Sequence, residues 1–135
     1  MLACTPAGAN PDAIEVTATR DPVDKSYRRM VRGMDLFESM RDLAPDAVLR
    51  YKLLPRRRDV DMDGITLEIV GDVDRIPVPL AADRSFTLER NQKALEEGAS
   101  VMPDRKAGSL TWRTDIRTPG LPPGTRRLGD LRLEC

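Results

Sequence analysis

The clearest sheet signal in the chain lies in residues 64–80, GITLEIVGDVDRIPVPL. Apolar residues occupy every second position of residues 65–69, which is the period of a strand with one buried face. The run that follows carries Pro77 and Pro79 on one parity. Because proline cannot donate to a sheet ladder, this second run is predicted to be an edge strand with that side unpaired.

On both sides of this stretch, short apolar runs are separated by glycine, proline and aspartate. It predicts further strands over residues 47–54, 85–89, 110–116 and 128–134, and an alternating strand near the start over residues 13–19. Residues 91–98 are predicted to form one or two helical turns, and residues 118–124 a stiff loop. A sheet of mostly neighbouring strands is therefore expected.

One long amphipathic helix is predicted over residues 21–43. Asp21 suits the cap position and Pro22 the first helical position, and the helix is expected to end at Ala44–Pro45. Apolar side chains recur along it at spacings of three and four, among them Met30, Met34, Phe37 and Met40. The predicted fold is α+β: an antiparallel sheet or two-layer β-sandwich with this N-terminal helix packed on it.

The methionine-rich stripe of this helix has two interpretations. Stripes at helical spacing usually face a core, which is the interpretation we favour. Methionine also adapts to partner surfaces, so Met30, Met34, Phe37 and Met40 form the alternative, a partner-binding face.

Length and charge limit the organisation and the partners. The chain has 135 residues, of which 40% are hydrophobic and 33% charged. We expect a flexible N-terminal tether over residues 1–12 and a single α+β domain over residues 13–135. Basic and acidic residues balance at 22 each, which argues against nucleic acid as a partner. Arginine outnumbers lysine by 18 to 4, which favours a GC-rich bacterial gene.

The chain contains no histidine, which excludes imidazole bases and histidine-ligated metal sites. It also has no Gly-x-Ser-x-Gly turn, phosphate-cradling loop or CxxC pair. No catalytic residue is assigned, and whether the chain is an enzyme stays open, with a non-enzymatic protein favoured. Trp112, on an alternating strand, is expected in the core.

One acidic loop has the composition of a calcium site. Asp59, Asp61 and Asp63 alternate before Gly64 and resemble the first half of an EF-hand loop, while Val70 stands where the bidentate glutamate is needed. We favour the interpretation of a β-hairpin with Asp63–Gly64 at its tip. Ca²⁺ at the three aspartates is the alternative, and no other cofactor is expected.

The N-terminus resembles the processing site of a bacterial lipoprotein. Met1-Leu2-Ala3 precede Cys4, and a small, proline-bearing stretch follows. The resemblance implies lipidation of Cys4 and a location in the periplasm or at the outer membrane, with the lipid as the only membrane contact. The alternative is an ordinary start followed by a flexible arm.

Residues 65–88 resemble the transthyretin-like sandwiches of the carboxypeptidase-regulatory type. The similar features are Thr66-Leu67-Glu68-Ile69, then Ile76-Pro77-Val78-Pro79-Leu80, and then Asp83-Arg84-Ser85-Phe86-Thr87-Leu88, which is similar to the Asp-Gly-x-Phe-x-Leu turn of that group. Arg84 stands where glycine is usual. The resemblance implies a structural or binding module and brings no active-site residue.

Together these features lead us to expect a non-enzymatic module of the bacterial cell envelope that binds a protein or glycan through a sheet edge or loop surface. The alternative is a histidine-independent hydrolase or calcium-dependent domain that uses Asp59, Asp61 and Asp63.

Overall fold

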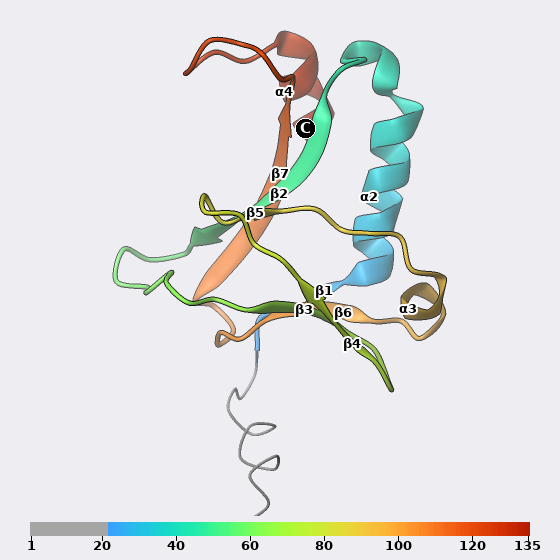
Figure 1. Ribbon diagram of the computed structural model, residues 1–135, viewed down its shortest axis with the longest axis vertical. Helices are drawn as coiled ribbons and strands as arrows, with labels where there is room; N and C mark the ends of the chain where they lie inside the picture. The colour runs from blue at the N-terminus through green and yellow to red at the C-terminus, as the bar shows by residue number, and fades with distance from the viewer. Residues whose placement is uncertain (1–21) are drawn as a thin grey trace, which may run out of the picture.

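The computed structural model describes residues 22–135, which form an α+β fold of two antiparallel sheets and short helices (Figure 1). The elements are β1 (Lys25–Ser26), α2 (Tyr27–Ser39), the 3-10 turn η1 (Arg41–Leu43), β2 (Val48–Pro55), β3 (Leu67–Val70), β4 (Arg75–Val78), β5 (Ser85–Phe86), α3 (Gln92–Glu96), β6 (Ser100–Pro103), β7 (Leu110–Arg117) and α4 (Leu128–Glu134). The predicted tether 1–12, the predicted strand 13–19 and Cys4 lie outside the described residues.

The first sheet has the strand order β1-β6-β3-β4. Strand β4 lies at its edge, with Pro77 opposite Glu68 of β3. The edge position predicted from the two prolines is confirmed. Strands β1 and β6 were not predicted, because each is short and their pairing joins residues far apart in sequence, as at Lys25 opposite Val101.

The second sheet has the order β5-β2-β7. Strands β2 and β7 pair over their full length, from Val48 opposite Arg117 to Pro55 opposite Leu110. The strands predicted over 47–54 and 110–116 are thereby confirmed. Strand β5 is shorter than the predicted 85–89, since only Ser85 and Phe86 pair with β2.

Both sheets and α2 contribute to one hydrophobic core. Tyr27 of α2, Phe86 of β5 and Val101 of β6 are completely buried in it. Trp112 is 2% exposed and meets the Phe86 ring edge-on, with ring centroids 6.3 Å apart, so its predicted core position is confirmed. The Tyr27 hydroxyl donates to the carbonyl of Glu89 at 2.5 Å, which satisfies its polar end.

The helix predicted over 21–43 is not shown; α2 is shorter, with bounds Tyr27–Ser39. Ser26 is its cap and accepts from the amide of Arg29 at 3.3 Å, because the preceding residues pair with β6. The helix ends where Met40 leaves helical backbone geometry and η1 begins. The helical turns predicted over 91–98 are confirmed as α3, whose cap residue Asn91 accepts from the amide of Ala94.

The predicted strand over 128–134 is wrong, since these residues form helix α4. The decisive contacts are tertiary. Asp130, completely buried, accepts from the amide of Thr118 at 2.7 Å and from its hydroxyl at 2.8 Å. One turn later, Glu134 accepts from the amide of Ile116 at 2.7 Å. Helix α4 thus holds the end of β7 through carboxylates that share one helix face.

The predicted β-hairpin with its tip at Asp63–Gly64 is also wrong. Strand β2 pairs with β5 and β7, whereas β3 pairs with β4 and β6, so the loop between β2 and β3 joins two different sheets. Gly64 nevertheless adopts the positive φ that was expected of a turn residue, at +65°.

Arg84 stands out in the turn before β5. Among residues 22–135 it is the one non-glycine residue with positive φ, at +64°. The turn is closed by hydrogen bonds from the amide of Arg84 to the carbonyl of Ala81 and from the amide of Ala81 to the carbonyl of Ser85, both 2.9 Å long. The Arg84 guanidinium donates to the carbonyl of Met62 at 3.0 Å and to Asp63 Oδ1 at 3.3 Å. These bonds hold the residue in the left-handed region.

Candidate functional site

The structure does not bring the three predicted metal ligands together. Asp59 pairs with Arg57 at 3.3 Å, and Asp63 pairs with Arg84 at 3.3 Å. The Asp61 carboxylate instead accepts from the backbone amide of Asp63 at 2.9 Å. Within residues 22–135, no group of three or more Cys, Asp or Glu side chains is placed to hold a metal ion. The predicted lipidation site, Cys4, lies outside this range.

The predicted apolar stripe of α2 divides along its length. Met30 is buried in the core described above, and Met34 packs partly against it. Phe37 is buried in a second, smaller cluster with Ala44, Ala47 and Ile116. Met40, at the end of the stripe, is 41% exposed. The core interpretation therefore holds for the first part of the stripe, while its end reaches the surface.

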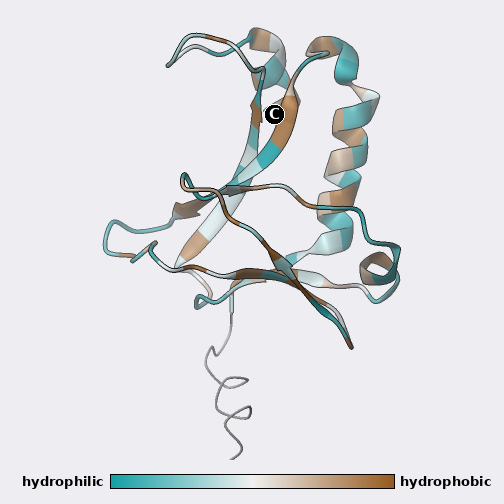
Figure 2. Ribbon diagram, viewed as in Figure 1, coloured by the Kyte–Doolittle hydropathy of each residue, from teal (hydrophilic) through white to brown (hydrophobic). Residues whose placement is uncertain are grey.

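Exposed apolar side chains gather at one end of the molecule, where α2 ends and α4 packs on η1 (Figure 1). Seven of the eight large apolar side chains that are exposed in residues 22–135 belong to these elements, to the start of β2 and to the loop before α4. They are Leu36, Met40, Leu43, Val48, Leu121, Leu128 and Leu131. Figure 2 shows hydrophobic segments recurring at this end. We call these seven residues the apical surface.

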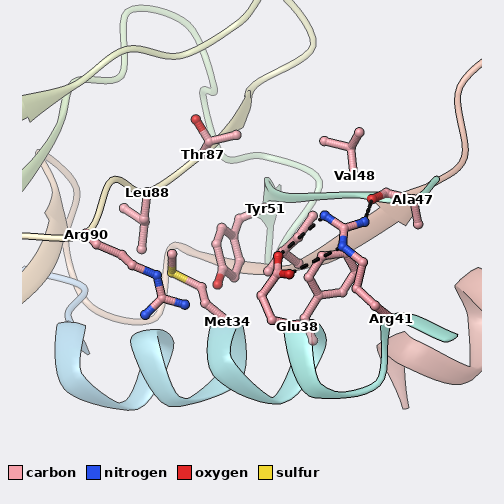
Figure 3. A pocket seen from close by; sticks show the side chains of 11 residues that line it. Met34, Glu38, Arg41, Ala47, Val48, Tyr51, Thr87, Leu88 and Arg90 are labelled. Atoms are coloured by element: carbon pink, nitrogen blue, oxygen red, sulfur yellow. Dashed lines mark hydrogen bonds and ion pairs between the residues drawn. The ribbon is translucent and has the colours of Figure 1, made fainter. Parts of the chain in front are cut away.

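A cavity of about 350 Å³ opens beside the apical surface, between α2, β2 and the segment after β5 (Figure 3). Its apolar wall includes Met34, Phe37 and Leu88, and Val48 belongs both to the cavity and to the apical surface. Its volume is at the lower end of the range of small-ligand pockets. It is large enough for an apolar side chain of a partner.

Two arginines are fixed at opposite sides of this cavity (Figure 3). Arg41 bonds to Glu38 at 3.3 Å and to the carbonyl of Ala47 at 2.7 Å, and its guanidinium lies 4.9 Å from the centre of the Phe37 ring. Arg90 pairs with Asp35 at 2.6 Å. The positive groups are therefore placed before any partner arrives, which lowers the entropy that binding must cost.

Tyr51 contributes a neutral hydroxyl to the same cavity. Burial raises the pKa of Tyr51 to about 12, although the positive charge of Arg90 lowers it in part. The phenol therefore stays protonated at neutral pH and serves as a hydrogen-bond donor or acceptor. In Figure 3 its hydroxyl is directed toward α2.

The arrangement is suited to binding. Its one carboxylate, Glu38, is paired with Arg41, and Thr87 is the only hydroxyl besides Tyr51 in the lining. Sequence reasoning found Met34 and Phe37 through the helical stripe but missed Tyr51, Arg41 and Arg90. An arginine in a chain with 18 of them carries no local signal.

No helix within residues 22–135 has both the length and the apolar composition needed to cross a bilayer. No family model, curated protein or solved structure matches the chain.

Proposed function

We propose that the chain is a non-enzymatic module of the bacterial cell envelope that binds another protein through the apical surface. The observation that carries this proposal is the gathering of seven exposed apolar side chains at one end of the molecule, beside a cavity with fixed arginines. Exposed apolar side chains that gather on one part of a protein surface are typical of interaction sites.

A protein is favoured over a glycan by the position of the aromatic rings. All five aromatic residues of the chain are buried: Tyr27, Phe37, Tyr51, Phe86 and Trp112. A sugar that stacks on a ring needs an exposed one, whereas aliphatic side chains such as Leu36 and Met40 suit the apolar anchors of a protein partner.

The location in the envelope is proposed from the sequence. The chain is periplasmic or held at the outer membrane, with a lipid on Cys4 as its anchor. The resemblance of residues 65–88 to transthyretin-like modules supports the same class. Labelled palmitate fed to cells that make the full-length gene product tests the anchor. Label that is lost in Cys4→Ser is expected, and unlabelled wild-type protein contradicts it.

The binding surface is tested by cross-linking in intact cells of the source bacterium. Leu36→Asp and Met40→Asp place a charge on the apical surface, while Val73→Asp places the same charge at a residue that is 79% exposed in the turn between β3 and β4. Exposed substitutions of this kind change stability by about 0.5 kcal/mol or less, so folding is retained in all three.

We expect wild type and Val73→Asp to cross-link to the same envelope protein, and the two apical variants to lose the product by about tenfold, equivalent to about 1.4 kcal/mol at the interface. Equal yields from all variants, or a product that contains only this chain, would refute the proposal.

A further inference from the structure

Tyr51 carries a buried hydroxyl that has no partner within residues 22–135. The residue is 5% exposed, yet its phenol oxygen forms no hydrogen bond with the rest of this range. The other tyrosine, Tyr27, donates to the carbonyl of Glu89 and accepts from the amide of Asn91. Because buried polar side chains nearly always have a partner, the Tyr51 hydroxyl points to a bound molecule.

The hydroxyl opens into the cavity of about 350 Å³ between α2, β2 and the segment after β5. In Figure 3 it is directed toward α2 and into this space. The oxygen keeps some accessible surface, whereas the indole nitrogen of Trp112 is fully enclosed. A molecule in the cavity can therefore reach the phenol oxygen.

The inner walls of this cavity are apolar and its mouth is polar. Phe37 and Leu88 are buried, and Met34 packs partly against the core. Thr87 and Glu38 also line the cavity, but both are exposed. The Tyr51 hydroxyl is thus a hydrogen-bonding group set among apolar walls, which is the usual arrangement in a pocket for a small molecule.

The charged groups around the cavity form two ion pairs. Arg41 pairs with Glu38 at 3.3 Å, and Arg90 pairs with Asp35 at 2.6 Å. These four side chains are between 40% and 60% exposed, so they belong to the rim, and their charges sum to zero. A charged molecule would lose hydration on entry without a net opposite charge in return. A neutral occupant is therefore favoured.

The phenol favours an occupant with a hydrogen-bond acceptor. Burial raises the pKa of Tyr51 to about 12, so at neutral pH the hydroxyl keeps a proton to donate. The guanidinium of Arg90 is close enough for its charge to act on this hydroxyl. Its positive potential repels the positive end of a donor group and attracts an acceptor oxygen. A carbonyl oxygen meets both conditions.

We propose that this cavity binds a small neutral molecule with an apolar body and a carbonyl oxygen that accepts a hydrogen bond from Tyr51. The apolar body contacts Met34, Phe37 and Leu88. The cavity has the volume of roughly a dozen water molecules, so it fits a ligand of about ten non-hydrogen atoms. This site does not depend on the protein partner proposed for the apical surface, although Val48 borders both.

Three probes of one hydrocarbon skeleton test the site: isocaproamide, which is neutral, isocaproate, which is negative, and isohexylammonium, which is positive. Each is titrated into the full chain, and the methionine methyl groups are followed by NMR. We expect isocaproamide to bind with a dissociation constant in the millimolar range and to shift the Met34 methyl. The methyl of Met30, which lines a separate groove, is expected to stay unchanged. The two charged probes are expected to bind at least about threefold more weakly.

Tyr51→Phe removes the hydroxyl and keeps the ring, which stacks on Phe86 with centroids 5.4 Å apart. It is expected to keep the melting temperature of the wild type, because the hydroxyl has no partner in the described part of the chain. Its affinity for isocaproamide is expected to fall by about threefold to tenfold. Thr114→Val is the matched control, since it removes a hydroxyl from the separate groove and is expected to keep the affinity of the wild type.

Four results would overturn the proposal. The first is a Met34 methyl that does not shift at isocaproamide concentrations on the order of 10 mM. The second is isocaproate or isohexylammonium binding as tightly as the amide. The third is equal affinity of wild type and Tyr51→Phe for isocaproamide. The fourth is a clear fall in the melting temperature of Tyr51→Phe, which would show that the hydroxyl serves the fold. None of these measurements needs a protein partner, so their outcome is independent of the cross-linking experiment.

Discussion

The left-handed backbone of Arg84 gives a prediction whose sign depends on two opposing terms. Arg84→Ala keeps a side chain in a conformation with φ of +64° and removes the guanidinium bonds to Met62 and Asp63. Arg84→Gly removes the same bonds but also relieves the backbone. Comparing the two variants therefore isolates the backbone term, since the side-chain contacts are lost in both.

The magnitudes follow from the geometry. The bond to the Met62 carbonyl is 3.0 Å long and partly exposed, and its loss is expected to cost about 1 kcal/mol. The Asp63 carboxylate is 90% exposed, so its pairing adds little. A non-glycine residue in the left-handed region costs about 1–2 kcal/mol, and glycine avoids this cost. Glycine also makes the unfolded chain more flexible, which lowers the free energy of unfolding by about 0.4–1 kcal/mol and offsets part of that gain. Arg84→Gly should therefore be about 0.5–1 kcal/mol more stable than Arg84→Ala.

Urea unfolding followed by circular dichroism measures both free energies, and the m-values show whether the unfolded states are comparable. The expected order of stability is wild type, then Arg84→Gly, then Arg84→Ala, with the alanine variant about 1 kcal/mol below wild type. An alanine variant as stable as the glycine variant, or more stable, would show that the positive φ carries no cost in this turn.

Three further predictions concern buried and acidic groups. Asp130→Ala leaves the amide and hydroxyl of Thr118 without their buried acceptor and is expected to cost about 3 kcal/mol in urea unfolding, with Asp130→Asn about half of that; an unchanged midpoint would contradict the role of this contact. Hydrogen bonds from the hydroxyl and the amide of Ser85 lower the pKa of Asp83. The stability that Asp83 contributes is therefore present above its unfolded pKa of 3.8 and is lost as the pH falls through the lower folded value. The difference in unfolding free energy between wild type and Asp83→Asn should therefore shrink between about pH 6 and about pH 2, and a constant difference would argue against it. Millimolar Ca²⁺ should leave the melting temperature unchanged, because Asp59 and Asp63 are each paired with an arginine, and a dose-dependent rise would show that the loop rearranges to bind the ion.

Local chemistry determined which parts of the fold were predictable. Apolar and polar residues alternate within β2, β3 and β7, so each of these strands can be recognised from its own segment. Proline cannot donate a backbone hydrogen bond, which predicts the edge position of β4 without knowledge of its partner strand. The positive φ of Gly64 belongs to the same class. Each of these properties depends only on residues within a few positions of one another.

The features that were missed depend on residues far apart in the chain. Both Asp21 and Ser26 can cap a helix, and the pairing of β1 with β6 decides for Ser26. The leucines of residues 128–134 fit neither period, and α4 forms because Asp130 and Glu134 meet the end of β7. In the candidate site, Phe37 carried a periodic signal, whereas nothing near Arg90 in sequence indicates the cavity that it lines.

The contact between α4 and the end of β7 has a consequence for solubility. The carboxylates of Asp130 and Glu134 and the guanidinium of Arg126 bind backbone groups at the end of β7 that could otherwise pair with a strand of another molecule. Helix α4 and Arg126 therefore protect this sheet edge from intermolecular strand pairing. Gly129 allows α4 to pack closely against η1, because any side chain at this position would collide with the carbonyl of Leu43. Substitutions that break the contacts between α4 and the end of β7 should therefore cause folded molecules to aggregate before any secondary structure is lost.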